Sequence, residues 1–291
     1  TPRLSEALRE GGRGLTSARG RRIRQAFVTA QVALSLVVLI GAGLLARSFD
    51  ALVSEDLGFD AQNLLTARVS LPGSSYPGPV EVQGFYEQLI TRVKALPGVL
   101  AVTVNVFAPF SGPGAGTGFE IVGRPAPVGQ APVTDARIVA ADYFQTLGIP
   151  LLHGRDFAAE EHAARRDVVI INEALARRHF AGRSPIGEKL VINMRAENGP
   201  STIVGVVGDI RHQKLDVPSR EMAYWPHSEL PLPSMTLLIR TAMAPLQMTP
   251  LLQREVWALD RNLPVSEPRT MEQLMAGTTA AIMFDFTYFR E

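Results

Sequence analysis

An uncharged run of 21 residues near the N-terminus, Ala26 to Ala46, constrains this chain more than any other feature. A helix rises about 1.5 Å per residue, so the run is long enough to cross the roughly 30 Å hydrocarbon core of a bilayer. Cleavable signal peptides usually have shorter apolar regions, of about 7–15 residues. The sequence therefore predicts an uncleaved transmembrane helix at 26–46, in preference to a buried core helix or a cleaved leader.

The charges on the two sides of this run differ in sign. Residues 1–25 carry seven arginines and two glutamates, whereas the chain from Phe49 onward carries 21 basic and 26 acidic residues. Arginines beside a spanning helix stay on the cytoplasmic side of the membrane. We therefore expect a basic cytoplasmic tail at 1–25 and an extracytoplasmic domain after Arg47, with a single pass through the cell inner membrane. The tail lacks interleaved aromatic residues and abuts the span, so we expect contact with the lipid bilayer and not with nucleic acid.

The outer part, about 240 residues, is long enough for one large domain or two small ones. The sequence contains no cysteine, which excludes disulfides, a thiol nucleophile and a Cys-ligated metal site. Residue 1 is Thr and not Met, so we expect the chain to be a fragment or a processed product. The last residues, 276–291, include an apolar stretch that is too short to span a bilayer.

Two strand–helix–strand patterns frame the outer part and predict an α+β fold. The first has a strand at Leu64–Leu71, a helix with an apolar stripe from Val82 to Leu96, and a strand at Leu100–Phe107. The second has a strand at Met235–Ile239, a helix at Leu246–Leu259 with Leu251, Leu252, Val256 and Trp257 on its apolar face, and an edge strand at Val265–Pro268.

Short strands predominate between these two units, and they predict a compact strand-rich insertion. We expect strands at Phe119–Val122, Asp135–Val139, Val168–Ile171, Lys189–Ile192 and Thr202–Val207, and short helices at Ala141–Thr146 and Glu173–Phe180. Asn172 is the predicted N-cap of the second helix.

Glycines alternate in the segment Ala108 to Gly118, at positions 112, 114, 116 and 118. A phosphate-binding loop needs such glycines between a strand and the N-terminus of a helix, but a strand is predicted to follow here. We therefore interpret the segment as a connector, and its composition makes it a candidate flexible joint.

Side chains capable of chemistry form no arrangement that is typical of catalysis. The common zincin, hydrolase and P-loop signatures are missing. Glu160, Glu161 and His162 are interpreted as a solvated charged turn and not as metal ligands. Asp209, Arg211 and His212 follow a strand, where ion pairing and loop anchoring are the simpler roles. Tyr224, Trp225 and Pro226 are interpreted as packed aromatics at a domain junction, in preference to a carbohydrate or peptide platform. We assign no catalytic, cofactor-binding or metal-binding residue.

Several stretches in a fixed order resemble one family of membrane proteins. They include RRIRQAFVTAQVALSLVVLIGAGLLARSF (21–49), GFDAQNLLTARVSLP (58–72), DYFQTLGIPLLHGRDF (142–157), VVIINEALARRHFAGRSPIGEKL (168–190) and TIVGVVGDIRH (202–212). In this order and spacing the chain resembles the periplasmic core domain of MacB-like ABC-transporter permeases, the group related to FtsX, and most of all the long permeases with a duplicated architecture.

The resemblance implies a two-part core domain at 50–275. A porter-like part would comprise 64–107 and 213–275, and an inserted strand-rich part would comprise 115–212. In such permeases the outer domain has no enzymatic role, and further spanning helices follow it. The end of this chain at 276–291 is therefore expected to be divergent or truncated.

The leading functional hypothesis is a non-catalytic permease segment of an ABC-type export or mechanotransmission complex. It would need a cytoplasmic ABC ATPase subunit and either further permease helices or a second permease chain as partners. The alternative is a membrane-anchored extracytoplasmic binding or sensor domain without transport, and an envelope enzyme is a third hypothesis that no motif supports. The sequence names no transported substrate, oligomeric state or ligand-binding residue.

Overall fold

A computed structural model of the chain describes residues 18–53, 57–111, 115–124, 126–127, 130–163, 166–192, 199–212 and 219–277. Side chains are described for these residues except 18–23, 44–53 and 115. The chain divides into two compact units, Thr1–Glu55 and Asp56–Glu291, and each is described here by itself.

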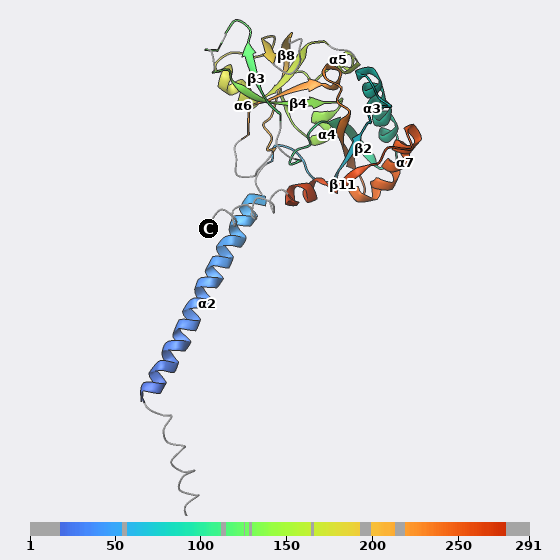
Figure 1. Ribbon diagram of the computed structural model, residues 1–291. Helices are drawn as coiled ribbons and strands as arrows, with labels where there is room; N and C mark the ends of the chain where they lie inside the picture. Colours follow the sequence, from blue (N-terminus) through green and yellow to red (C-terminus); the bar gives the residue numbers. More distant parts are fainter. Residues whose placement is uncertain are drawn as a thin grey trace, which may run out of the picture. The chain divides into compact units, whose positions relative to one another are not determined.

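The first unit contains one long helix, α2, at Ala18–Val53 (Figure 1). Its 36 residues correspond to about 54 Å at 1.5 Å per residue. No residue is buried between Arg24 and Gly43, and large apolar side chains such as Phe27 and Leu39 are at least 70% exposed. A helix with apolar side chains on all sides and no protein covering suits the interior of a bilayer. A helix over 26–46 is thus confirmed, and within this unit its apolar side chains are exposed, while the membrane crossing stays a prediction.

The second unit is built on an 11-stranded sheet. The strands are β1 Leu64–Ser70, β2 Val99–Asn105, β3 Ala115–Ile121, β4 Val133–Val139, β5 Leu151–Gly154, β6 Val168–Asn172, β7 Lys189–Ile192, β8 Pro200–Val207, β9 Met222–Pro226, β10 Ser234–Thr241 and β11 Ser266–Thr270. Neighbours follow the order β11-β1-β10-β2-β4-β3-β7-β8-β6-β9, with β5 paired to β8 and β4 also paired to β9. The helices are α3 Pro79–Lys94, α4 Tyr143–Leu147, α5 Ala159–Ala163, α6 Glu173–His179 and α7 Thr249–Leu259, with short 3-10 helices η1 His227–Glu229 and η2 Pro245–Met248.

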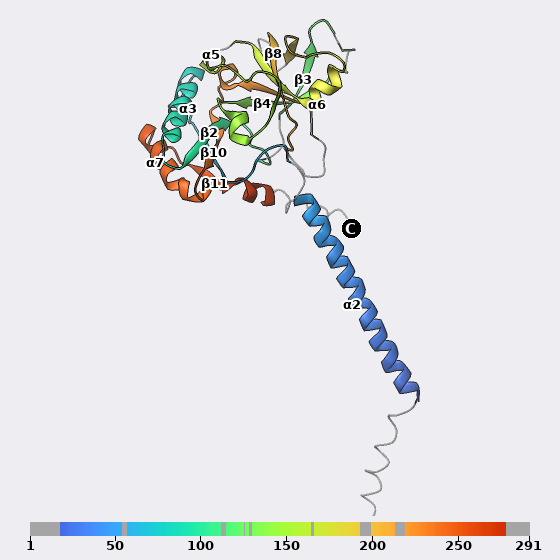
Figure 2. The ribbon, with the colours of Figure 1, turned by 180° about the vertical axis from the view of Figure 1, so that it is seen from behind.

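One apolar core lies between α3, α7 and strands β1, β2 and β10. The predicted stripe on α3 is confirmed, because Val82, Phe85, Leu89 and Val93 are all buried. α3 and α7 lie side by side, as the opposite views in Figures 1 and 2 show. On α7 the prediction was wrong for Trp257, which is 50% exposed.

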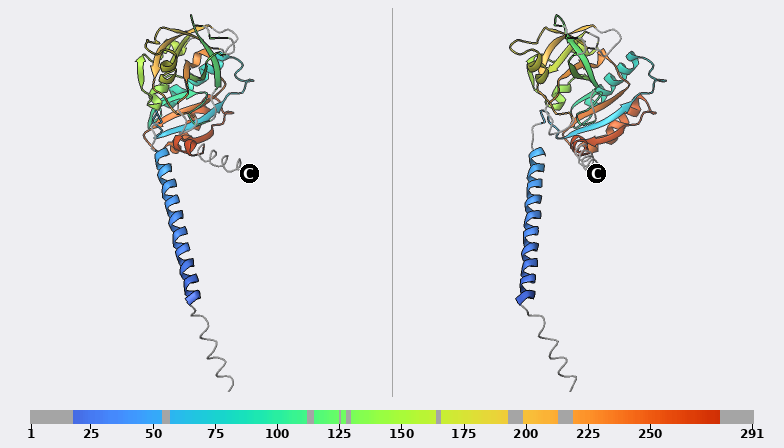
Figure 3. Two further views of the ribbon diagram at one scale, coloured as in Figure 1. Left: turned by 90° about the vertical axis from the view of Figure 1, so that its left-hand side faces the viewer. Right: turned by 60° about the vertical axis from the view of Figure 1, so that its left-hand side comes forward.

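The pairing of these strands inserts β10 between β1 and β2. β1 and β10 are antiparallel over seven residue pairs, and β10 and β2 are also antiparallel. β1 and β2 therefore run in the same direction without touching, a split arrangement of the predicted strand–helix–strand unit. The predicted edge strand is confirmed, since β11 pairs only with β1 at one end of the sheet (Figure 3).

A second apolar core lies among β3, β4, β6, β7, β8, β9 and α6. The five predicted strands of this region are present, and the Asn172 side chain caps α6 by accepting a hydrogen bond from the Leu175 amide at 3.1 Å. Three elements were not predicted: β5, α5 and β9. The strand β9 is the central omission, because it pairs with both β4 and β6 and all five of its residues are buried.

Candidate functional site

The shortest strand pairing described in the sheet is between β2 and β4, which share one residue pair, Asn105 and Val139. The neighbouring contacts are longer, with six pairs between β10 and β2 and five between β4 and β9. This point lies where the strands of the first core meet those of the second. Two backbone hydrogen bonds flank this pair, from Val106 N to the Ile138 carbonyl at 3.3 Å and from Ala140 N to the Val104 carbonyl at 2.9 Å, so backbone pairing here is short.

Five polar side chains at this point are almost completely buried, and we call them the seam. They are Asn105, Asp135, Arg137, Tyr143 and His212, each at most 5% exposed. They come from β2, β4, α4 and the segment after β8. Polar side chains are thus buried where the two sets of strands meet, beside Val106, which packs against both apolar cores.

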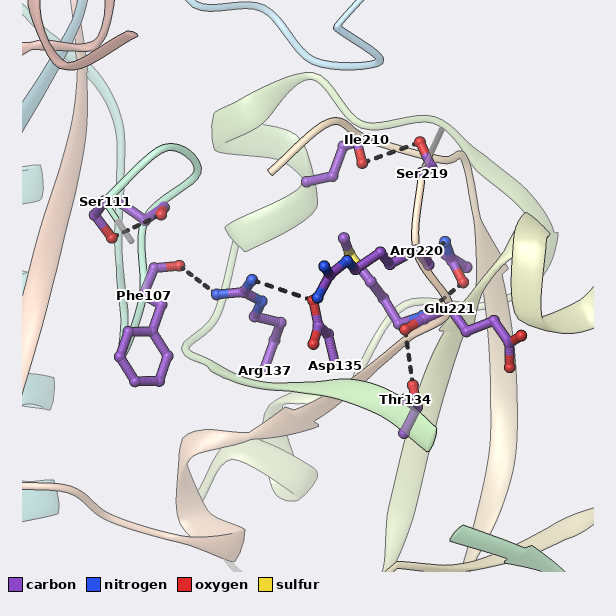
Figure 4. Close-up of polar contacts among 12 residues, drawn as sticks. Phe107, Ser111, Thr134, Asp135, Arg137, Ile210, Ser219, Arg220 and Glu221 are labelled. Carbon is purple, nitrogen blue, oxygen red and sulfur yellow. Dashed lines mark hydrogen bonds and ion pairs between the residues drawn. The ribbon is translucent and has the colours of Figure 1, made fainter. Parts of the chain in front are cut away.

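Arg137 is the central charge of the seam, and it is only 1% exposed. Its Nη1 donates to the Phe107 carbonyl at 3.4 Å, and its Nη2 lies 3.9 Å from Asp135 Oδ2 (Figure 4). The guanidinium also stands 5.8 Å from the centre of the Phe107 ring. Nε and Nη2 have no hydrogen-bond partner among the described residues. A buried charge normally requires close pairing, and the contacts of Arg137 are long for a guanidinium that is so deeply buried.

His212 and Tyr143 add further buried polar atoms beside Arg137. Burial, reinforced by the positive charge of Arg137, lowers the pKa of His212 well below its usual 6.5, so the ring is neutral at pH 7. Burial raises the pKa of Tyr143 to about 12 even though Arg137 opposes the shift. Neither ring nitrogen of His212 has a hydrogen-bond partner in the described part of the chain.

A pocket of about 570 Å³ adjoins the seam and shares Asp135 with it. Its lining comes from β3, β4, α6 and the residues leading into β9: Gly116, Val133, Thr134, Asp135, Ala174, Arg177, Arg178, Ser219, Arg220 and Glu221. Glu221 is held by Arg178 at 2.8 Å and by His179 at 2.7 Å. Arg177 is held by Asp209 at 3.4 Å and by Glu173 at 3.6 Å. The pocket therefore presents three guanidinium groups and two carboxylates.

Comparison with known protein families accounts for this combination of an apolar helix and a mixed α/β domain. The family model of the MacB-like periplasmic core domain matches residues 27–256, most of the chain. This chain belongs to that family. The predicted resemblance is thereby confirmed, and the family is a component of transporter permeases that is generally non-enzymatic.

The chain is also similar to three solved structures at low sequence identity. The periplasmic region of MacB from Actinobacillus actinomycetemcomitans is 17% identical with a TM-score of 0.47, and the match covers 77% of this chain and 95% of that one. The extracellular domain of the noncanonic ABC-type transporter YknZ from Gram-positive bacteria is 14% identical with a TM-score of 0.45, over 70% of this chain and 100% of that one. A domain of a permease protein from Porphyromonas gingivalis is also 14% identical, with a TM-score of 0.45, over 73% and 92% of the two chains. Among curated protein sequences, none matches this one significantly.

The prediction of a solvated charged turn at Glu160, Glu161 and His162 is wrong. These residues lie in α5, where Glu161 is 7% exposed and accepts two hydrogen bonds from Arg155 at 2.7 and 2.8 Å. Arg155 thereby lowers the pKa of Glu161 below its usual value. Within the described ranges no three His, Asp or Glu side chains gather in a way that could hold a metal ion.

The prediction of loop anchoring after β8 is confirmed for Asp209. Its Oδ1 accepts from Asn172 Nδ2 at 2.7 Å and from the Ala174 amide at 2.8 Å, which ties this segment to the start of α6. The aromatic residues Tyr224 and Trp225 are 0% and 3% exposed, so packing is confirmed and an exposed platform is excluded.

The glycine-rich segment is divided by the start of β3. Gly116 and Gly118 belong to that strand and pair with Asp135 and Val133, so the predicted connector is wrong from residue 115 onward. Gly112 and Gly114 lie outside the described residues.

Sequence reasoning missed Asn105, Asp135 and Arg137, and also the arginines of the pocket. One signal was present: Asp135 and Arg137 are charged residues two apart in a strand that is otherwise rich in apolar residues, VTDARIV. Residues two apart in a strand share a face, so both charges had to face the same surroundings.

Proposed function

We propose that this chain is a non-catalytic permease segment of an ABC-type export or mechanotransmission complex in the cell inner membrane. Its N-terminus is cytoplasmic, and α2 carries movement from an ATP-hydrolysing partner to the extracytoplasmic domain. The observation that supports this best is the single family match that begins inside the apolar helix and extends through the domain. Arginines on the N-terminal flank of the helix support the orientation.

The proposal divides the outer domain into a porter-like part and an inserted part that meet at the seam. The two apolar cores and the one-pair contact between β2 and β4 support this division. The boundary differs from the expected one at 213, because β9 pairs with β4 and β6 and contributes to the second core. We therefore assign β9 to the inserted part, and the porter-like part resumes with β10.

A seam of this kind favours relative movement of the two parts. The strands β2 and β4 share one residue pair, and the five buried polar side chains of the seam lie beside it. Regions with few packed apolar contacts open at lower free energy than a continuous core does, and small movements are amplified where two rigid bodies meet. Asn105 and Arg137 are thus placed at the expected hinge.

Co-purification tests the assignment to a transport complex. The full chain with a C-terminal tag is expressed in its native host, solubilised in mild detergent and purified, and the bound proteins are identified. An ABC ATPase is expected in the eluate. The control is the same chain with 26–46 replaced by a leucine-rich helix of equal length, which keeps the anchor and removes the native helix surface. Recovery of the native chain as a folded monomer without an ATPase would contradict the proposal.

A second candidate function is an anchored extracytoplasmic binding domain without transport. The pocket beside Asp135 favours it, because charged groups from three separate segments converge there. A ligand that binds only the folded state raises the melting temperature. A ligand-dependent rise in melting temperature, together with a co-purification that yields no ATPase, would support this candidate over the first.

A further inference from the structure

We propose that the pocket beside Asp135 binds a small zwitterion, a molecule with an ammonium group and a carboxylate such as a free amino acid or dipeptide. This inference deepens the second candidate function, the anchored binding domain, and does not depend on the coupling proposal. It comes from two charges of opposite sign, Asp135 and Arg220, that line one pocket and that the protein leaves incompletely paired.

Asp135 supplies the negative end. It is only 5% exposed, yet its Oδ2 has no hydrogen-bond partner among the described residues and lies 3.9 Å from the nearest arginine nitrogen. Oδ2 is enclosed beside Arg137, whereas Oδ1 lies on the side of Gly116, 4.0 Å from a Cβ built at that glycine of the lining, so Oδ1 is the oxygen that a donor in the pocket would meet. An ammonium group provides such donors together with the opposite charge.

Arg220 supplies the positive end. Its side chain is exposed, and none of the described acidic residues is within ion-pair distance of it. Arg177 and Arg178 differ from it, because each already has an acidic partner. In Figure 4, Asp135 lies between Arg137 and the segment that carries Arg220. A ligand carboxylate therefore finds a guanidinium that the protein has not engaged.

The mixture of charges selects a zwitterion over a simple ion. A pure anion would meet the carboxylates of Asp135 and Glu221, and a pure cation would meet three guanidinium groups. Gly116, Val133 and Ala174 leave a small apolar part of the wall for a short side chain. The volume of about 570 Å³ is typical of small-molecule pockets and admits a dipeptide.

Gly116 offers a way to block the pocket without altering its charges. A Cβ built at this position would lie 3.6 Å from Val133 Cγ1 and 4.0 Å from Asp135 Oδ1, which are ordinary contacts. Gly116→Val therefore fits the strand and extends methyl groups toward the carboxylate. Valine also favours strand conformation, so β3 should keep its fold.

The test uses the full chain in detergent and three probes: alanylalanine, its N-acetyl form and its C-terminal amide. Saturation-transfer NMR titrations give the Kd of each. The free dipeptide is expected to bind at least about tenfold more tightly than either capped form, which corresponds to about 1.4 kcal/mol. Arg220→Gln and Gly116→Val should abolish saturable binding, whereas Arg261→Gln, which removes an exposed arginine outside the pocket, should leave it unchanged.

The N-acetyl probe tests the Asp135 end without a variant, since replacing Asp135 would also remove the partner of Arg137. Equal binding of free and capped dipeptides would overturn the proposal. The absence of saturable binding by the native chain, or unchanged binding by Arg220→Gln, would overturn it as well.

Discussion

Acidification should destabilise the outer domain through His227, a residue of η1 that is only 4% exposed. Its ring packs edge-on against Tyr86, with 5.6 Å between the ring centres. Its Nε2 has no hydrogen-bond partner in the described ranges. Burial, with a smaller contribution from nearby His162, lowers the pKa of His227 from 6.5 to about 4. The folded protein therefore holds this ring neutral at pH values where the unfolded chain protonates it.

The sign and size of the effect follow from this difference in pKa. Stability from the neutral ring is complete above pH 6.5 and is lost as the pH falls toward 4, because the unfolded state then binds the extra proton. Each pKa unit corresponds to about 1.36 kcal/mol, so the loss approaches about 3 kcal/mol at the lower pH. The pKa of His162 is also lowered by burial, and its effect has the same sign.

Urea unfolding of the full chain in detergent, followed through the fluorescence of buried Trp225, measures this loss at about pH 7.5 and about pH 4.5. In His227→Gln the fall in unfolding free energy between these two pH values should be smaller than in the native chain by about 2–3 kcal/mol. His153→Gln serves as the control, because His153 is exposed on β5. An unchanged pH dependence in His227→Gln would refute the reasoning.

Three further substitutions test the packing at other points, each by urea unfolding. Tyr86→Phe removes a hydroxyl that accepts from the Met235 amide at 3.2 Å and should cost about 1–3 kcal/mol; a change below about 0.5 kcal/mol would contradict this. Arg137→Met leaves Asp135 buried without its partner and should cost about 3–5 kcal/mol, and adding Asp135→Asn should recover most of the loss. Asn172→Ala removes the cap of α6 and an acceptor for the Met222 amide, so a cost of about 2 kcal/mol is expected, and a near-neutral effect would show that the cap is dispensable.

Local sequence patterns sufficed to predict the helices whose apolar surface is evident from their own residues. The α2 run and the α3 stripe are examples, because charge-free length and a three- and four-residue spacing each determine which surface must avoid water. The same rule failed at Trp257. Periodicity locates the apolar face of a helix, but it does not show how much of that face the rest of the protein covers. Trp257 lies at the edge of the covered area and is half exposed.

Non-local pairing accounts for what sequence reasoning could not find. The placement of β10 between β1 and β2 joins segments more than 130 residues apart in the sequence, and no local signal encodes it. Arg137 is similar, since its burial results from Phe107, His212 and β9 closing around β4. The pocket likewise requires α6 and the residues before β9 to meet the β3–β4 edge. Without those contacts the arginines look like ordinary solvated charges.

Distance measurements across the seam test the proposed coupling most directly. The chain has no cysteine, so pairs of spin labels can be placed at will. A cross-seam pair uses exposed positions on α3 and after α6, Gln88→Cys with Ala181→Cys, and a control pair within the porter-like part uses Gln88→Cys with Arg254→Cys. In the complex with its ATPase, trapping ATP hydrolysis should shift the cross-seam distance distribution and leave the control distribution unchanged. An unchanged cross-seam distribution in a complex that hydrolyses ATP would contradict the account.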